Sequence, residues 1–595
     1  MPPCTTRATD EWGRDAGQFR SRATVLFMDV RTIDRALGVL AENAARWTRL
    51  PLSTKIYLLD DVRRRVGGVA ASWVEAARIA KRLAPGSPLL GEDWTSGPYA
   101  IASAAAAYAE TLRRIDRGDP VVPPQLIRTL PNGRVAVRVF PTNTEDRLLL
   151  SGHTADVWML PGLTENDAER RAAAFYRARE PNDSVAVVLG AGNIASIPAL
   201  DLLTELFTHG SVVALKLNPV NAYLGEFFET IFGPLIEGGF VRLLYGGTEE
   251  GTYLTRHSLV DRIHVTGATS THNAIVFGTG PDAAARKAAD DPVIDTPVTS
   301  ELGGVGPTIV VGGTWSAADL RYQAQHIISQ KLHNHGFNCV ACQILVLPES
   351  WNQADDLLDA MRSVVADLDE RWAYYPGAIV RQQAALEAHP GAEVLSDGSA
   401  PVTFITDLDP GDPNEVCFTT EFFGAVLGVV RLPGVDAGSY LRNAVRFANE
   451  VLDGNLGANV IVHPATMSKH SQDFDDAVRD LRYGTVAVNS WVGVAFAMTR
   501  ATWGGFPGNR RNDIRSGNGI AHNALMLDGV ERTVVRGTFA PFPRTIRQGV
   551  WHAEPLPPHF LTNANAAVIG EQLTEYAVTG STKPIPALLA AALRA

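Results

Sequence analysis

A cysteine and a glutamate, each close to glycine, are the residues of this 595-residue sequence whose types and spacing could do chemistry. Cys339 ends the segment HNHGFNC, and Glu301 opens the segment ELGGVGP, 38 residues earlier. A thiolate can attack an electrophilic carbon, and a carboxylate can activate the water that releases the product. The pair therefore indicates covalent catalysis with Cys339 as nucleophile and Glu301 as general base.

Other interpretations of Cys339 stay open. An isolated cysteine is often a buried structural residue, and the spacing Cys339-x-x-Cys342 permits a redox pair or half of a zinc site. With four cysteines in the chain, no second pair completes such a zinc site. A capping box, Ser316 to Asp319, begins a helix that Gly336 would end, so we expect Cys339 on a loop before the next strand.

The alternative for Glu301 is a surface carboxylate, which is the commoner fate of a single glutamate. The sequence places it after a loop and before a strand. The adjacent pair Gly303-Gly304 permits close approach of another backbone or of a ligand. This pair favours an active site over a plain surface turn.

The elements that would position these residues alternate between helices and strands. Residues 31–116 show helical spacing, with Ser53 as an N-cap, and residues 134–160 form two alternating strands of a long hairpin. From residue 184 the pattern predicts βαβ units and parallel sheets with ligands beyond the carboxyl ends of the strands. The expected strands are Val185–Leu189, Val212–Leu215, Val241–Leu244, Ile263–Val265, Thr308–Val311, Gln343–Leu347, Ala425–Val430, Asn459–His463 and Thr485–Asn489. Proline-rich segments after residue 540 indicate an irregular tail with a final helix near Ile585–Leu593.

Composition and charge exclude several classes of protein. The net charge of −11 would repel phosphate backbones, so nucleic acid is not an expected partner. No apolar run approaches the ~18–20 residues that cross a bilayer, and the first residues lack the apolar centre of a signal peptide. Four cysteines are too few for a disulfide framework. We therefore expect a cytoplasmic globular protein with more than one core.

The order of the motifs resembles the aldehyde dehydrogenase family over residues 130–540. ELGG resembles the general-base signature of that family, and Gly336-Phe337-Asn338-Cys339 resembles its nucleophile signature, with Phe337 in the place of the usual Gln or Glu. Further segments that resemble family motifs are VLGAGN with Pro198, VALK, GFV, VTGA and EFFG. So many elements in the same order seldom agree by chance.

The resemblance implies NAD or NADP as cofactor and assigns roles to particular residues. The catalytic residues would be Cys339, Glu301 and Asn193, the last as a donor to the oxyanion. The cofactor-binding residues would be Lys216, Gly239, Thr266, Gly267, Ala268, Leu302, Glu421 and Phe423. Pro219 stands where NAD-preferring relatives carry Glu, so we expect NADP to be accepted. No metal ligand is expected.

The implied reaction is oxidation of a small-molecule aldehyde to a carboxylic acid through a cysteine thiohemiacetal and a thioester. Three alternatives stay open: an acyl-CoA reductase or CoA-acylating aldehyde dehydrogenase, a non-catalytic cofactor-binding scaffold, and a thiol oxidoreductase that uses both cysteines of the CxxC segment. Glu301 favours hydrolysis, because CoA-using relatives generally lack the base.

The expected fold is α/β, with a Rossmann-type cofactor domain, an α/β catalytic domain and a β-hairpin oligomerisation element. Residues 1–130 would be the helical part of the cofactor domain, 131–165 the hairpin, 166–300 the cofactor domain and 301–500 the catalytic domain. Residues 501–540 would return to the cofactor domain, and 541–595 would be the tail. Val530–Gly537 resembles the family's strand that pairs across subunits, so a homodimer or homotetramer is expected.

Overall fold

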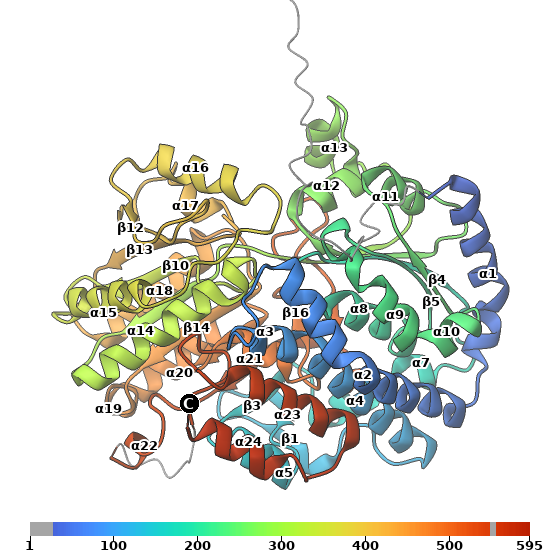
Figure 1. Cartoon of the computed structure of the whole chain (residues 1–595), viewed down its shortest axis with the longest axis horizontal. Coiled ribbons are helices and arrows are strands. Elements are labelled where there is room, and N and C mark those ends of the chain that lie inside the picture. The colour runs from blue at the N-terminus through green and yellow to red at the C-terminus, as the bar shows by residue number, and fades with distance from the viewer. Residues whose placement is uncertain (1–27, 548–554, 595) are drawn as a thin grey trace, which may run out of the picture.

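Two large sheets, each covered by helices, organise the chain (Figure 1). The computed structural model describes residues 28–547 and 555–594. One sheet has five strands in the order β6-β5-β4-β7-β8, and the other has eleven in the order β1-β2-β3-β18-β15-β14-β9-β10-β13-β12-β11. In Figure 1, β4 and β5 lie on the right, and β10, β13 and β14 lie on the left. The mixed α/β architecture matches the expected fold class.

The five-stranded sheet is parallel throughout. It consists of β4 (Val185–Leu189), β5 (Val212–Lys216), β6 (Val241–Leu244), β7 (Arg262–Gly267) and β8 (Val298–Leu302). The first four were expected, and their bounds differ by at most two residues. The chain runs from β4 outward to β5 and β6 and then returns to β7 on the other side of β4. The carboxyl end of β4 is therefore the switch point where such sheets bind ligands.

The eleven-stranded sheet joins a parallel part to an antiparallel hairpin. Its strands are β1 (Ile127–Thr129), β2 (Val135–Phe140), β3 (Thr154–Met159), β9 (Pro307–Val311), β10 (Ile344–Pro348), β11 (Glu393–Val394), β12 (Thr403–Leu408), β13 (Val426–Leu432), β14 (Gly457–Val462), β15 (Thr485–Val488) and β18 (Val530–Arg536). The predicted hairpin is present, because β2 and β3 pair antiparallel. A separate small sheet pairs β16 (Trp503–Gly504) with β17 (Ile520–His522).

Helices cover both sheets. The amino-terminal half contains α1 (Val30–Thr48), α2 (Leu52–Ala80), α3 (Leu90–Trp94), the π-helical turn η1 (Thr95–Tyr99), α4 (Ala100–Asp116), η2 (Pro124–Leu126), α5 (Thr144–Leu149), α6 (Glu165–Arg171), α7 (Ala174–Arg177), α8 (Ile197–Phe207), η3 (Pro219–Leu224), α9 (Gly225–Ile231), α10 (Gly233–Glu237), α11 (Thr248–Thr255), α12 (Thr269–Phe277) and α13 (Ala283–Ala289). The second half contains α14 (Ala317–Leu332), η4 (His333–Gly336), α15 (Ala354–Ala366), α16 (Ala378–Ala388), α17 (Val416–Thr419), α18 (Ala437–Glu450), α19 (Pro464–Lys469), α20 (Ser471–Asp480), α21 (Val492–Ala497), α22 (Arg544–Arg547), α23 (Ala566–Thr579) and α24 (Ile585–Ala592).

Several local expectations were wrong. The helix expected to be capped by Ser53 begins two residues earlier than that cap implies, at Leu52, and its N-cap is Pro51, whose fixed φ suits the entry to a helix. Glu301 lies within strand β8 rather than on a loop, because residues 298–302 pair in register with β7.

The strand β18 differs from the expectation in its partners. It pairs with β15 on one side and with β3 on the other, both within the same chain. A strand with both edges paired has no backbone groups left to pair with a second subunit. In this structure β18 therefore pairs within its own chain, and the hairpin extends the sheet of that chain; the expected homodimer or homotetramer stays a prediction.

The tail is more ordered than expected. The final helix is present as α24, but a second helix, α23, precedes it. Figure 1 shows both helices in red: α23 lies beside α2 and α3, and α24 packs on α23. Within residues 28–547 and 555–594, no helix is long and apolar enough to cross a membrane.

Candidate active site

The loop that carries Cys339 follows directly on α14. The predicted capping box begins this helix: the Ser316 hydroxyl accepts from the N–H of Asp319, whose carboxylate accepts from the N–H of Ser316. Beyond the helix, Asn334 has a φ of 53° and His335 a φ of 56°. Asn and His adopt this left-handed backbone more readily than most residues. The turn returns the chain, and with it Cys339, to the carboxyl ends of the five-stranded sheet.

Gly336 completes this turn and touches a second loop. Its φ is 78°, and a Cβ atom built on it would lie 2.3 Å from the carbonyl oxygen of Gly424. Only glycine can occupy this position without moving one of the two backbones. The Cys339 loop and the segment Glu421-Phe422-Phe423-Gly424 are therefore held in direct contact.

The predicted nucleophile and base meet in the folded chain. Sγ of Cys339 donates to Oε1 of Glu301 over 3.7 Å. The same oxygen accepts from the indole Nε1 of Trp503 over 2.9 Å. Only 1% of the Glu301 surface is exposed, and its other carboxylate oxygen has no hydrogen-bond partner among the described residues. The carboxylate is thus shielded from solvent, and the surrounding protein determines its pKa.

Burial governs the ionisation of both groups. It raises the pKa of Glu301 to about 7, and the hydrogen bond from Trp503 opposes part of that rise. Burial also raises the pKa of the Cys339 thiol, and the carboxylates of Glu301 and Glu421 add to the effect. Cys339 is therefore a thiol in the resting site, with Glu301 beside it as a proton acceptor of near-neutral pKa.

Asn193 lies at the same site with part of its side chain already engaged. Its side-chain Nδ2 atom donates to the carbonyl oxygen of Phe337 over 3.1 Å. The backbone carbonyl oxygen of Asn193 accepts from the side chains of Asn334 and Tyr374. Asn193 also lines the cavity that Cys339 faces. The residue expected to stabilise the oxyanion is thus near the nucleophile and fixes the backbone of its loop.

A cavity of about 620 Å³ runs from the carboxyl ends of β4, β5 and β7 to Cys339. Six of the eight expected cofactor residues line it: Lys216, Thr266, Gly267, Ala268, Glu421 and Phe423. Burial lowers the pKa of Lys216, while the nearby Glu250 opposes the change. The cavity lies at the switch point of the five-stranded sheet, where the fold predicts a ligand.

Two of the expected cofactor residues lie elsewhere. Gly239 precedes the amino end of β6, the opposite end from the ligand edge, and its turn packs on the side chain of Asn43. Leu302 is fully buried, and its N–H donates to the carbonyl oxygen of Ser516. Neither residue lines the cavity, although Glu301 and Gly303, on either side of Leu302, do.

The pair Gly303-Gly304 makes room for a carboxylate. A Cβ on Gly303 would lie 2.2 Å from Oε2 of Glu421. Burial raises the pKa of Glu421 to about 8, and Glu301 contributes to the rise. Oε1 of Glu421 is buried and has no hydrogen-bond partner in the described chain. An orphaned carboxylate oxygen beside the cavity is suited to accept hydroxyl groups of a ligand.

Several residues that hold the site were not found from the sequence. Trp503 reaches Glu301 from 202 positions away. Arg381, on α16, donates to the carbonyl oxygens of Phe422 and Phe423 and so fixes the loop that bears Glu421. The segment that begins at Trp503 resembles a late glycine turn of the family, but the sequence assigned neither residue a role in the site, because their partners are distant in the sequence.

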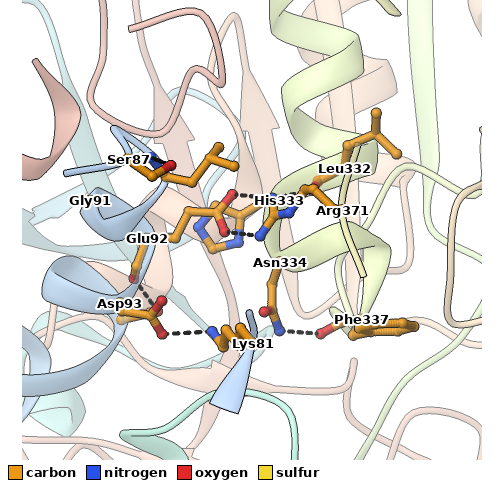
Figure 2. A network of polar contacts seen from close by, with 12 residues as sticks. Lys81, Ser87, Gly91, Glu92, Asp93, Leu332, His333, Asn334, Phe337 and Arg371 are labelled. Carbon is orange, nitrogen blue, oxygen red and sulfur yellow. Dashed lines mark hydrogen bonds and ion pairs between the residues drawn. The ribbon is translucent and has the colours of Figure 1, made fainter. Parts of the chain in front are cut away.

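Behind the nucleophile loop lies a network of buried ion pairs (Figure 2). Arg371 forms two hydrogen bonds with the carboxylate of Glu92, at 3.0 and 2.7 Å, and also donates to the carbonyl oxygen of Leu332 at the end of α14. Lys81 pairs with Asp93 at 2.6 Å. The network joins α2 and α3 to the start of the nucleophile loop.

The second cysteine of the CxxC segment does not face the site. Cys342 is fully buried, lines neither the cofactor cavity nor the apolar cavity described below, and has a pKa that burial raises to about 11. The three cysteines among the described residues are all free thiols. A redox pair made by Cys339 and Cys342 thus finds no support in this structure.

The described residues include one group that could hold a metal ion, a kind of site that the sequence did not predict. It consists of His389, Glu415 and Cys417, whose ligand atoms all lie within 4.8 Å of one another. His389 Nε2 lies 3.0 Å from Glu415, and its Nδ1 lies 3.0 Å from the carbonyl oxygen of Ala385. The three side chains tie α16 to α17, outside both cavities, and help to place the loop of Glu421.

A second cavity meets the first at the nucleophile. It is largely apolar, has a volume of about 290 Å³ and is lined by Cys339 together with Ile194, Trp491 and Phe496. Cys339 thus lines both cavities: the larger one at the edge of the five-stranded sheet and the smaller, apolar one. A nucleophile at such a junction can contact two ligands at once.

Comparison with known proteins agrees with this architecture. The profile of the aldehyde dehydrogenase family matches residues 176–519, more than half of the chain. The N-succinylglutamate 5-semialdehyde dehydrogenase of Ectopseudomonas mendocina is 26% identical over 232 residues, which are 36% of this chain and 44% of that protein. The chain spans less than half the length of the first curated relatives it matches.

Solved structures show the same fold. An NAD-dependent aldehyde dehydrogenase from Sinorhizobium meliloti has a TM-score of 0.58 at 16% identity, over 87% of this chain and 89% of that one. A glyceraldehyde-3-phosphate dehydrogenase from Methanocaldococcus jannaschii, complexed with NADP, has a TM-score of 0.57 at 13% identity, over 86% and 95%. The chain belongs to the aldehyde dehydrogenase family.

Proposed function

We propose that this chain is an NAD(P)-dependent aldehyde dehydrogenase that converts an aldehyde to a carboxylic acid through a thioester on Cys339. The observation that carries the proposal is the position of Cys339 at the junction of two cavities, with its Sγ 3.7 Å from Oε1 of Glu301. One cavity suits a cofactor and the other an apolar substrate.

The residues that line the larger cavity fit a nicotinamide cofactor. The unpartnered Oε1 of Glu421 is an acceptor for ribose hydroxyls, and Lys216 at the end of β5 is a donor for the other ribose. A Cβ on Gly251, at the wall, would meet nothing within 4 Å, so this part of the wall leaves open space. When bound, the cofactor accepts the hydride that the substrate loses.

The residues of the chain perform the remaining chemistry. Glu301 takes the proton of the Cys339 thiol, and the thiolate adds to the carbonyl carbon of the aldehyde. The oxyanion is stabilised by the backbone N–H of Cys339 and by the second N–H of Asn193, since an amide nitrogen has two hydrogens and one is bonded to Phe337. After hydride loss, Glu301 releases the thiol proton to solvent, and the ionised carboxylate then activates the water that hydrolyses the thioester.

Replacement of each cysteine in turn tests the proposal. Cys339→Ala should abolish aldehyde-dependent reduction of NAD or NADP and leave cofactor binding, followed by protein fluorescence, intact. Cys342→Ala is the matched control and should keep most of the activity, because Cys342 lines neither cavity. An active Cys339→Ala enzyme would overturn the assignment. A wild-type enzyme that forms product only after CoA is added would replace hydrolysis with acyl transfer to CoA.

A further inference from the structure

The apolar cavity is closed on one side by the part of the chain that follows the family match. That match ends at residue 519, whereas the cavity wall includes residues 555–559, one face of α23 and part of α24. On α23 the lining residues are Ile569, Leu573, Tyr576 and Ala577. Their spacing is that of a single helix face. Val568, on another face of the same helix, is 48% exposed and does not line the cavity.

The C-terminal helices are docked closely against the rest of the protein. A Cβ on Gly91 of α3 would lie 2.6 Å from the backbone of Ala566, and a Cβ on Gly570 would lie 2.6 Å from Cβ of Trp94. Such close approach between α3 and α23 requires glycine at both positions. Figure 1 shows α23 beside α2 and α3 along its length.

The segment before α23 is anchored as well. The ring of Phe560 stacks on His326 of α14, and the N–H of Leu561 donates to the hydroxyl of Ser329 on the same helix. His559 packs against Trp491, which lines the cavity near Cys339. The wall is thus a fixed part of the folded chain and extends from the neighbourhood of the nucleophile outward.

The chemistry of the walls defines what the cavity accepts. Near Cys339 the wall is formed mainly by apolar side chains, with Asn338 and His333 beside them. Burial lowers the pKa of His333 and His559, so these imidazoles are neutral at pH 7. The charged lining residues are Arg63, Asp146 and Arg500. Arg63 lies beside the exposed Gly580, and Arg500 is paired with Glu110, which places charge toward the opening.

We propose that residues 555–594 form the outer wall of a substrate channel and make the enzyme selective for aldehydes with a long, uncharged aliphatic chain. The inference rests on the proposed function, because it places the aldehyde carbon at Cys339. The chain of the substrate would lie against Leu573 and Ala577 of α23, and water would be displaced from the channel. Aldehydes that carry a charge near the carbonyl would be excluded, since the inner wall offers that charge no ionised partner.

A series of straight-chain aldehydes from propanal to dodecanal measures this selectivity. We expect kcat/KM to rise by about fourfold for each added methylene until the channel is filled, which corresponds to ~0.8 kcal/mol per buried methylene. Succinic semialdehyde, with its carboxylate, should be a poor substrate. A kcat/KM that stays constant or falls with chain length would overturn the inference and leave the proposed function intact.

Ala577→Trp and Leu573→Trp narrow the channel from α23. Each should lower kcat/KM for decanal at least tenfold and leave that for propanal within twofold. Val568→Trp, on the exposed face of the same helix, is the matched control and should change neither value. An equal loss for both aldehydes in both channel variants, with an unchanged melting temperature, would show that α23 does not select for chain length.

Thiol labelling tests the channel without aldehyde oxidation. In the absence of cofactor, N-octylmaleimide should modify Cys339 faster than N-ethylmaleimide, and Ala577→Trp should remove that difference. Mass spectrometry of digested protein identifies the modified cysteine. Equal rates for the two reagents in the wild-type protein would contradict an apolar channel, whether or not the enzyme oxidises aldehydes.

Discussion

The indole N–H of Trp503 and the thiol of Cys339 both donate to Oε1 of Glu301, at 2.9 and 3.7 Å. The base of the proposed reaction is therefore held by a residue from the small sheet β16-β17. The indole stabilises the ionised carboxylate, in opposition to burial, which raises its pKa to about 7. The two effects together set the pH at which Glu301 can accept a proton.

Trp503→Phe should shift the pH profile of kcat/KM toward higher pH. Glu301 acts when ionised, so the rate rises as the pH rises through its pKa, and loss of the indole donor raises that pKa. The shift should be about 1–2 units, because a hydrogen bond to a charged group contributes ~1.5–3 kcal/mol. Activity should fall near pH 7 and recover at higher pH. An equal loss of activity at every pH would mean that Trp503 only shapes the cavity.

Glu301→Gln should separate formation of the thioester from its hydrolysis. The amide cannot activate water, and such general-base assistance contributes about 10²–10⁴-fold. Stopped-flow absorbance should show a burst of reduced nicotinamide near one equivalent per subunit, followed by slow turnover, with the acyl group on Cys339 by mass spectrometry. The burst itself should speed up with rising pH, since the thiol has lost its proton acceptor. Normal steady turnover by this variant would remove Glu301 from the mechanism.

The sequence predicted the parts of the site that lie in short segments. Residue type and spacing indicated Cys339 and Glu301, and the family resemblance implied Glu421; all three residues line one cavity in the structure. The glycine pair after Glu301 predicted a close approach by another group but not which group. In the structure the carboxylate of Glu421 packs against Gly303.

Contacts between distant segments could not be predicted in this way. Trp503 meets Glu301 across 202 positions, and nothing in either segment names the other. The partners of β18 were missed for the same reason, because the pattern of a strand shows which face is buried but not which strand lies beside it. The helix α23 did carry a signal, the helical spacing of Ile569, Leu573 and Tyr576, but the proline-rich segments before it indicated an irregular tail.

The cofactor cavity predicts use of NADP. Pro219 lines the cavity three residues after Lys216, and the acidic residues among those that line it are Glu301 and Glu421, which lie with Cys339. Glu250 lies near Lys216, but it is buried, accepts from the N–H of Gly247 and does not line the cavity. No carboxylate of the lining therefore repels a 2′-phosphate near the end of β5. We expect kcat/KM with NADP to equal or exceed that with NAD.

Pro219→Glu should reverse this preference. A carboxylate facing a 2′-phosphate costs enough to lower kcat/KM for NADP by about tenfold or more, with little change for NAD. Pro219→Gln serves as the control, because the glutamine side chain has the size of glutamate but no charge. A strong preference of the wild-type enzyme for NAD would show that another group excludes the 2′-phosphate.

The ion pair of Glu92 and Arg371 should contribute to stability in a way that depends on pH. Both side chains are at most 9% exposed. Burial alone would raise the pKa of Glu92, but the guanidinium of Arg371 and its hydrogen bonds lower it to about 2. Since the folded-state pKa lies below the ordinary value, the stabilisation is present above about pH 4.5 and is lost as the pH falls toward 2.

Arg371→Met removes the cation and leaves a buried carboxylate without its partner. We expect the free energy of unfolding at pH 7, from urea denaturation, to fall by about 3–5 kcal/mol. The deficit should narrow between pH 7 and pH 4, because burial then raises the pKa of the unpaired Glu92 and protonation removes its charge. The double variant Glu92→Gln with Arg371→Met should be less destabilised at pH 7 than Arg371→Met alone.

Arg442→Met provides the control for this prediction, because Arg442 pairs with Asp473 on the surface, where 68% and 38% of the two side chains are exposed. Solvent screens such a pair, so its loss should change the stability little.

Arg371 also donates to the carbonyl oxygen of Leu332, where α14 ends and the Cys339 loop begins. Arg371→Met should therefore lower kcat at pH 7 as well. A deficit in stability that stays constant from pH 7 to pH 4 would show that lost packing of Arg371, rather than the unpaired buried charge of Glu92, destabilises the protein.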